Sequence, residues 1–267
     1  MIGIKRNGGI TPIILSDKNT LFPPGPAVDP VLANNDWATI KAVCEAGEAG
    51  NYWSLGDYKT TQVDSVDVRA VIVDLTVGRY KDSSNNDNNM VLELRWYNAS
   101  ISGDDKWLQF YRTTQQMNSS STNAGGWNGS ELRTWLNGTF KGLLASDLQT
   151  VLDKTWKIPA MNGGNQTGTE LVYSDDYLTL ASEKEIFGTV SYESSTEAAV
   201  ETQYGLYSAN NTNAYRIKYK SSGSADGWWL RSTYKDYNYR FCRVFGGGGS
   251  DYFSANSSLG VVPFIPM

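Results

Sequence analysis

The carboxyl-terminal segment 227–267 constrains the fold most, because it alternates between two kinds of sequence. Three apolar runs are bounded by turn residues: GWWLRS (227–232), FCRV (241–244) and GVVPFI (260–265). Runs of this kind predict buried strands. The tracts between them, 233–240 and 245–259, are almost free of aliphatic residues and rich in Tyr, Ser, Asn, Asp, Gly, Arg and Phe. Rings give contact area at low rotamer cost and small polar side chains adapt their hydrogen bonds, so we expect a recognition surface carried on buried strands.

The predicted ligand-binding residues are aromatic, charged or small polar side chains of this segment. They are Tyr234, Asp236, Tyr237, Tyr239, Arg240, Arg243, Phe245, Asp251, Tyr252, Phe253, Ser254 and Asn256. We expect them to point outward together on one patch, with the tyrosines and arginines as anchors. The alternative is a flexible surface loop without a ligand. Trp228 and Trp229 are neighbours in a predicted strand, so we expect one in the core and the other at the rim of the patch.

Composition excludes several classes of protein. With 267 residues, of which 40% are hydrophobic and 12% aromatic, the chain is long enough to bury one substantial core. The net charge of -5 and the lack of a basic stripe argue against a nucleic-acid partner. No apolar run approaches the roughly 18 residues that a membrane span needs, so we expect no membrane insertion. The first residues do not resemble a signal peptide, which predicts a protein made in the cytoplasm without an export signal.

The chain contains no histidine, which excludes the common catalytic triads, His-ligated zinc and imidazole acid–base chemistry. Cys44 and Cys242 each fall in an apolar pattern, so we expect two buried, reduced cysteines, with a disulfide or a reactive thiol as the alternative. No carboxylate stands alone in an apolar setting that would raise its pKa. We therefore predict no catalytic residue and no enzyme activity.

No cofactor and no metal ligand are predicted. The acid pairs Asp104–Asp105 and Asp175–Asp176 are interpreted as solvated loop residues, with calcium binding as the alternative. The glycine run 246–249 is interpreted as a flexible turn, because neither Lys-Ser nor Lys-Thr follows it as in a phosphate-binding loop.

Two domains are expected. Residues 1–35 form an amino-terminal arm, because the prolines of LFPPGPAVDP (21–30) lack amide donors and fix the backbone. This arm is either a flexible leader or a segment for assembly and anchoring. Residues 36–267 form the ligand-binding domain, whose tract 233–259 is the variable-type region.

Within this domain, local signals predict the following elements. We expect helices over 36–47 (capped by Asn35 or Asp36), 130–137 (capped by Ser130 and stopped by Gly138), 145–153 and 197–209, and a helical turn opened by a Ser182–Glu185 capping box. Strands are expected over 10–15, 68–77, 91–97, 154–159, 177–180 and 215–220, the second covered on both faces and the last exposed.

An ordered set of motifs carries a family resemblance. The motifs are WSLGD (53–57), SELRTWLNGTF (130–140), LASEKEIFG (180–188), GWWLRS (227–232) and the closing G-V-x-P (260–263). Together they are similar to a large family of bacterial and prophage-encoded domains of unknown function, in the formylglycine-generating-enzyme-like branch of the C-type lectin fold. The resemblance covers residues 36–267 and implies an α+β domain with a small irregular antiparallel sheet, two or more helices and extensive loops. The paired active-site cysteines of those enzymes are missing around Cys242, so their chemistry does not carry over.

Some proteins of this fold are the variable proteins of diversity-generating retroelements, which rewrite codons at adenines. Asparagine codons altered only at adenines never become Lys, Glu, Gln, Met or Trp. Between Thr233 and Leu259 the sole residue of these five types is Lys235. The tract therefore has the composition that such a process leaves, although a short aromatic, glycine-rich loop can match it by chance.

The resemblance implies a receptor-binding protein, namely a phage tail-tip adhesin that displays a diversified surface to a cell-surface protein or glycan. A fibre-tip position would favour a homotrimer in contact with other virion proteins, and it fits the expected lack of an export signal. The alternative is a structural virion or surface assembly module without its own ligand. A carbohydrate-active enzyme is the third hypothesis.

Overall fold

The computed structural model describes residues 2–6, 9–13, 27–164 and 170–267. Near the amino terminus, β1 (Ile2–Arg6) and β2 (Gly9–Ile13) pair antiparallel in a two-stranded sheet, where the sequence predicted a single strand over 10–15. Most of the proline-rich segment 21–30 lies outside the described residues. The body begins before the predicted boundary at residue 36, because Val28 packs against the core and Leu32 is buried.

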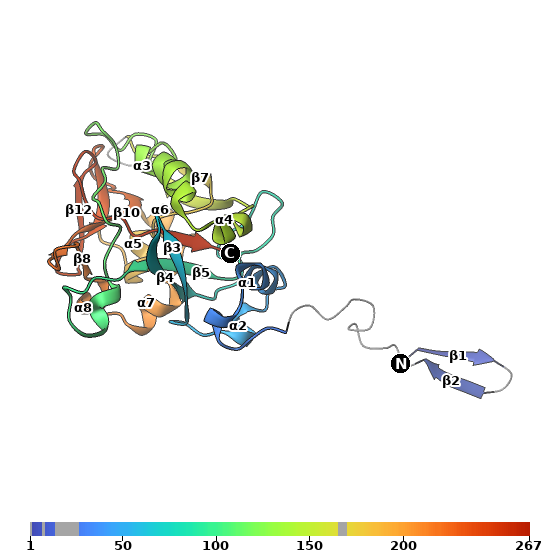
Figure 1. Ribbon diagram of the computed structural model, residues 1–267. Helices are drawn as coiled ribbons and strands as arrows, with labels where there is room; N and C mark the ends of the chain where they lie inside the picture. The colour runs from blue at the N-terminus through green and yellow to red at the C-terminus, as the bar shows by residue number, and fades with distance from the viewer. Residues whose placement is uncertain (1, 7–8, 14–26, 165–169) are drawn as a thin grey trace.

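A four-stranded antiparallel sheet lies at the centre of the body (Figure 1). Its strands are β3 (Tyr58–Val63), β4 (Val66–Asp74), β5 (Val91–Trp96) and β13 (Phe264–Pro266), in the order β13-β5-β4-β3. Every residue from Ala70 to Asp74 is buried, which confirms the prediction of a strand covered on both faces. Pairing of β13 with β5 joins the last strand to the first half of the body, and thereby anchors the end of the segment that carries the predicted site.

A second sheet carries that site. Its strands are β10 (Trp228–Thr233), β11 (Arg240–Val244) and β12 (Ser250–Ser254), paired antiparallel in that order. β12 was missed from the sequence, because its residues belong to the polar tract predicted as loop. β10 is buried along its whole length, and Trp228 and Trp229 both have 0% exposure. The prediction that one tryptophan lies at the rim is therefore wrong; both indole N–H groups donate to backbone carbonyls.

Local capping signals set several helices. Asp36 accepts a hydrogen bond from the Thr39 amide at the start of α1 (Trp37–Glu45). Ser130 caps α3 (Glu131–Trp135), and a π turn over Leu136–Phe140 continues it past Gly138, which does not stop it. The capping box of Ser182 and Glu185 opens α5 (Glu183–Phe187) as predicted. The helix predicted over 145–153 is α4 (Ser146–Val151).

Three predicted elements differ from the structure. The strand predicted over 177–180 is a single bridge, in which Thr179 pairs with Phe264 of β13. The helix predicted over 197–209 is divided into α6 (Ser195–Ala198) and α7 (Gly205–Ala209), because residues 199–204 leave the helix and turn Glu201 into the interior. The exposed strand predicted over 215–220 is α8 (Asn213–Arg216) followed by β8 (Lys218–Tyr219). Lys218 is buried there because its ammonium group pairs with Glu93.

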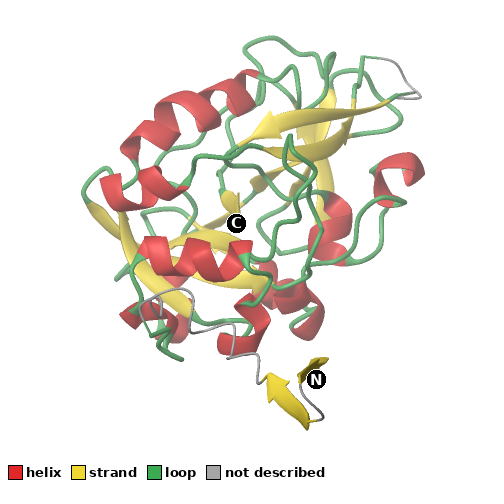
Figure 2. Cartoon of the chain, turned by 90° about the vertical axis from the view of Figure 1, so that its right-hand side faces the viewer, coloured by secondary structure: helices red, strands yellow, loops and turns green. Residues whose placement is uncertain are grey.

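The remaining elements are short and joined by long loops (Figure 2). They are α2 (Ala49–Tyr52), β6 (Trp156–Met161), β7 (Leu171–Asp176), β9 (Ala225–Asp226) and the 3-10 turns Leu32–Asn34, Gly103–Trp107 and Lys141–Leu143. One hydrophobic core connects both larger sheets, and the predicted α+β class is confirmed. Cys44 and Cys242 are buried free thiols, as predicted. No helix in the described part of the chain is long and apolar enough to cross a membrane.

Candidate functional site

The predicted binding residues lie on the β11–β12 hairpin and on the turns at its two ends. None of them is buried. Tyr237, Phe245 and Phe253 are among the exposed large hydrophobic residues, at 39%, 40% and 40% exposure. The buried residues of the same hairpin, Phe241 and Cys242, hold it to the core. The hairpin therefore exposes aromatic side chains to solvent while its buried residues stay packed against the core.

Five tyrosines form a continuous cluster at one end of the hairpin. We call Tyr192, Tyr234, Tyr237, Tyr239 and Tyr252 the tyrosine cluster. The rings of Tyr234 and Tyr252 stack with centroids 4.2 Å apart, and Tyr192 meets Tyr252 edge-on at 4.9 Å. Tyr237 lies 5.4 Å from Tyr234 and 5.6 Å from Tyr239. Sequence reasoning missed Tyr192, which lies in the loop before α6, outside the carboxyl-terminal segment.

Arg240 occupies the middle of the tyrosine cluster. Its guanidinium carbon lies 4.7 Å from the ring of Tyr237, 4.9 Å from that of Tyr239 and 4.7 Å from that of Tyr252. Among the described residues it has no carboxylate partner. Cation–π attraction therefore holds the arginine while its N–H donors stay available to a partner. Asp236 lies beside Tyr234, where burial and this neighbouring carboxylate raise the pKa of the Tyr234 hydroxyl to about 12.

A second group lies on the opposite face of the hairpin, because strand residues alternate between the two faces. Arg243 forms an ion pair with Asp251 at 2.6 Å, and its guanidinium carbon lies 4.1 Å from the ring of Phe253. Arg240 and Tyr252 belong to the other face, since Arg240 pairs with Ser254 and Cys242 with Tyr252. The predicted residues thus form two neighbouring groups, not the single patch expected.

The turn after β11 is fixed by its glycines. A Cβ added to Gly247 would lie 2.5 Å from the ring of Phe245, and one added to Gly249 would overlap the same ring. Gly248 has a φ of +82°, and its carbonyl accepts a hydrogen bond from Arg216 Nε at 3.0 Å. The run predicted to be flexible is therefore a defined turn. Gly248 is the position that requires glycine, because its φ is positive and a Cβ would overlap the Asn213 carbonyl.

Ser254 and Asn256 lie at the far end of β12. The Ser254 hydroxyl donates to Asn256 Oδ1 at 2.8 Å, and it lies 2.8 Å from the hydroxyl of Ser121. Asn256 also fixes the loop 115–118 through its carbonyl, which accepts from the Gln116 side chain at 2.6 Å. These two residues hold the end of the hairpin as well as facing solvent.

Beneath the hairpin lies a group of buried acids that the sequence did not reveal. We call Glu183, Glu185, Glu193, Glu197 and Glu201 the acid cluster; four of them have 0% exposure and Glu201 has 7%. Arg231 of β10 is also fully buried and pairs with Glu185 and Glu201. The prediction that no carboxylate lies in a setting that raises its pKa is wrong.

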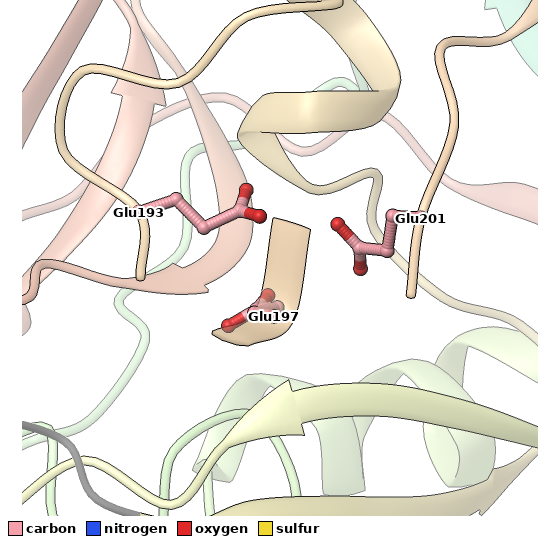
Figure 3. A group of neighbouring side chains, drawn as sticks. All are labelled: Glu193, Glu197 and Glu201. Carbon is pink, nitrogen blue, oxygen red and sulfur yellow. The ribbon is translucent and has the colours of Figure 1, made fainter. Parts of the chain in front are cut away.

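Three of these acids converge on one point (Figure 3). One carboxylate oxygen of each of Glu193, Glu197 and Glu201 lies within 4.8 Å of the others. Burial, followed by the charge of a neighbouring glutamate, raises the pKa of Glu193 and that of Glu197 to about 8. Burial also raises the pKa of Glu201 well above its usual range. The regular spacing of four residues was the available sequence signal.

The acid cluster also supports the tyrosine cluster. Glu183 accepts hydrogen bonds from the backbone amides of Ser191, Tyr192 and Glu193 at 2.7–3.1 Å. Its other contact is the hydroxyl of Ser250 at the start of β12. One buried carboxylate therefore fixes both the loop that carries Tyr192 and the strand that carries Tyr252.

The interpretation of the two acid pairs as solvated loop residues is wrong for Asp176, which lies at the end of β7. Asp176 is buried, and its oxygens accept from Trp127 Nε1 at 2.7 Å, Ser174 Oγ at 2.9 Å and Arg133 Nε at 2.5 Å. Asp104 and Asp105 lie in the first turn of a surface 3-10 helix. Of the groups of acids in the described residues, the converging trio of Figure 3 is the one with metal-ligand spacing.

Three cavities lie away from the predicted residues. One of about 490 Å³ is bounded by α1, the loop 85–89 and α4, and a more open one of about 680 Å³ lies beside Trp96 and Tyr111. The third, of about 210 Å³, reaches Glu185 and Glu201 of the acid cluster. The tyrosine cluster lines none of them and is an open surface.

One family model matches the chain, over residues 87–266, and its description is a domain of unknown function (DUF6273). The matched region runs from the loop before β5 to the last residue of β13, and so includes the hairpin and the acid cluster. No curated protein and no solved structure matches the chain significantly.

Proposed function

The chain belongs to the DUF6273 family of domains of unknown function, and from this premise we propose that it is a ligand-binding protein that uses its β11–β12 hairpin to recognise a cell-surface protein or glycan. The observation that carries the proposal is the tyrosine cluster around Arg240. Tyrosine and arginine are the residue types that most often anchor interfaces, because they combine large apolar area with directed hydrogen bonds.

The tyrosine cluster is organised in advance of binding. The rings of Tyr234 and Tyr252 stack on each other, and Tyr192 closes one side of the pair. A side chain that is already held loses less conformational entropy when a partner docks; the saving is about 0.5–1.5 kcal/mol for each immobilised side chain. Rings that support one another are thus better anchors than the same rings on a mobile loop.

The shape of the site favours a macromolecular partner. Small-molecule sites are concave, and the tyrosine cluster lines none of the three cavities described above. Exposed rings on an open surface suit a protein epitope or the apolar faces of sugars. The net charge of -5 makes nucleic acid an unfavourable partner.

The wider setting of the proposal is a phage tail tip whose adhesin varies in the tract 233–259. The buried residues of this tract, such as Phe241 and Val244, carry the packing, while those of the tyrosine cluster face solvent. Lys235 ties the tract to the neighbouring loop, since its amide donates to the Tyr192 carbonyl and its ammonium group to that of Ser191. In a homotrimer with other virion proteins, several weak sites would gain avidity.

A binding screen with matched variants tests the proposal. Wild-type protein, Tyr237→Ala and Tyr252→Ala are applied to a glycan array and to a pulldown of surface proteins. Tyr173→Ala is the control, because Tyr173 has 53% exposure and lies on β7, outside the tyrosine cluster. Loss of a captured ligand in the two cluster variants alone, with unchanged circular dichroism, supports the proposal. Equal binding by all four proteins would contradict it.

The structural assembly module remains the second candidate, because a β1–β2 hairpin precedes the body. Particles that lose the protein when residues 1–26 are deleted, but adsorb normally with Tyr237→Ala, would favour it. Retroelement diversification has its own test in the neighbouring DNA. A near-copy of the segment that encodes 233–259, differing at adenines and lying beside a reverse transcriptase gene, is the expected finding.

A further inference from the structure

The carboxylates of Glu193, Glu197 and Glu201 converge on one point (Figure 3). Glu201 pairs with Arg231 and accepts a hydrogen bond from Ser182 Oγ, whereas Glu193 and Glu197 form no ion pair among the described residues. Glu193 Oε2 accepts from the Lys184 amide and from Ser232 Oγ, and Glu197 Oε2 accepts from the Met161 amide at 3.0 Å. Each of these residues keeps its Oε1 buried and without a hydrogen-bond partner. A fully buried carboxylate oxygen without a partner destabilises the fold, because it has lost its hydrogen bonds to water and makes none in the protein.

The nearby positive charge is already used. Arg231 contacts Glu201 with one nitrogen, and its bidentate contact with Glu185 occupies the rest of its carboxylate-facing edge. Neither Glu193 nor Glu197 forms an ion pair with a lysine or an arginine side chain among the described residues. Two carboxylates thus face each other inside the protein without a cation between them.

The spacing and chemistry of the oxygens fit calcium. Because a Ca–O distance is about 2.3–2.6 Å, two oxygens on opposite sides of one calcium ion lie up to about 5 Å apart. The ligand oxygens of the trio lie within 4.8 Å of one another. Magnesium gives up its water ligands reluctantly and is seldom held by protein oxygens alone, so a buried set of carboxylates suits calcium better. A set made only of oxygens also favours a hard cation over zinc or copper.

A cavity reaches one member of the trio, Glu201. The cavity of about 210 Å³ is lined by Arg79, Tyr80, Glu185, Glu201 and Thr202, among others. Arg79 at its edge pairs with Asp74 at 2.8 Å, so its charge is neutralised locally. Glu201 lines this cavity and belongs to the trio, so an ion entering there meets one of its ligands directly.

We propose that Glu193, Glu197 and Glu201 form a calcium site. The ion satisfies the two unpaired carboxylate oxygens and offsets the repulsion among the three acids. It also joins separate parts of the chain, because Ser232 of β10 and the Met161 amide of β6 hold the outer oxygens of Glu193 and Glu197. The segment between α5 and α7, which carries Tyr192, thereby becomes tied to both strands.

Calcium titration of the chelator-treated wild-type protein is the primary test. We expect one bound calcium ion per chain by isothermal titration calorimetry and a rise in Tm with added calcium. Magnesium should bind at least about tenfold more weakly, because the trio is buried and magnesium gives up its water ligands reluctantly. No heat of binding, no change in Tm and no calcium by metal analysis would overturn the proposal; the acids then share protons instead.

Variants assign the site to the trio. Glu193→Gln and Glu197→Gln keep the shape and remove the charge, so both proteins should fold without the ion. We expect calcium affinity to fall by at least about tenfold in each. Glu131→Gln is the control, since Glu131 bonds Ser119 at the surface and should leave affinity unchanged. Calcium affinity equal to that of wild type in both trio variants would place the ion elsewhere and refute the assignment.

Discussion

Arg231→Met removes the central cation of the acid cluster. The side chain has 0% exposure, and its guanidinium group donates to the carbonyls of Pro159 and Leu180 at 3.0 and 2.8 Å. It also contacts Glu185 through two hydrogen bonds, of 2.5 and 2.9 Å, and pairs with Glu201. Methionine fills much of the volume but leaves both carboxylates buried without their partner.

Breaking a buried ion pair on one side costs about 3–5 kcal/mol, because the remaining charge keeps its desolvation penalty. In Arg231→Met, two carboxylates and two carbonyls lose a hydrogen-bond donor. Because the glutamates can take up protons, we expect the free energy of unfolding to fall by an amount within that range and not by several times as much. The total free energy of unfolding of a domain is about 5–15 kcal/mol. The variant should therefore be folded only marginally.

Urea unfolding followed by tryptophan fluorescence measures the loss, since the chain has nine tryptophans. Arg243→Met is the matched control, because its pair with Asp251 is partly exposed, at 18% and 32%, and such pairs contribute about 0–1 kcal/mol. The deficit of Arg231→Met should be smaller at about pH 5 than at about pH 7. Burial raises the pKa of Glu185, but Arg231 holds it below its usual range in the wild type, so without Arg231 this carboxylate takes up a proton as the pH falls. A loss no larger than that of the control, at either pH, would refute the reasoning.

Three further predictions follow from buried contacts. Burial alone would raise the pKa of Glu93, but Arg95 and Lys218 lower it to about 2, below the usual 4.5. The free energy that ionised Glu93 contributes to folding is therefore complete above about pH 4.5 and is lost as the pH falls towards 2. In urea unfolding, the stability of Glu93→Gln should depend less on pH over that range than the stability of the wild type does. Gly248→Ala should lower the free energy of unfolding by about 1–3 kcal/mol, because φ is +82° and the new Cβ would overlap the Asn213 carbonyl. The control Gly138→Ala, whose new Cβ would have no atom within 4 Å, should change it by less than about 1 kcal/mol. Equal losses of stability in thermal unfolding of the two variants would contradict this account. Burial raises the pKa of the Cys44 thiol to about 12 and that of Cys242 well above its usual range, so a thiol reagent should label neither cysteine until the protein is unfolded, and rapid labelling of the native protein would be inconsistent with the fold.

Elements governed by neighbouring residues could be predicted from the sequence. Asp36 and the Ser182–Glu185 capping box mark helix starts through contacts within one turn, and both are present. The apolar run of β4 predicted a strand covered on both faces, and the structure has one there. These features depend on local backbone geometry and on side-chain pattern, which a sequence displays directly.

Features that depend on distant partners could not be predicted in the same way. β12 forms because it pairs with β11 across a glycine turn, although its own composition is that of a loop. In the sequence, the spacing of the acids in 183–201 is that of a solvated helix. Their burial depends on Arg231, which is distant in the sequence. Besides the spacing of four residues in the trio, Arg231 itself was a signal: an arginine inside an otherwise apolar strand requires carboxylates from elsewhere in the chain.

Strand β11 has a consequence for protein engineering. Phe241 and Val244 are buried in it, while Arg240 and Arg243 reach solvent. Together with the neighbouring turn positions, this separation makes the hairpin a ready-made scaffold for combinatorial libraries. Surface positions of β11 and β12 can be randomised while the inward residues stay constant, and new specificities can then be selected from a single stable framework.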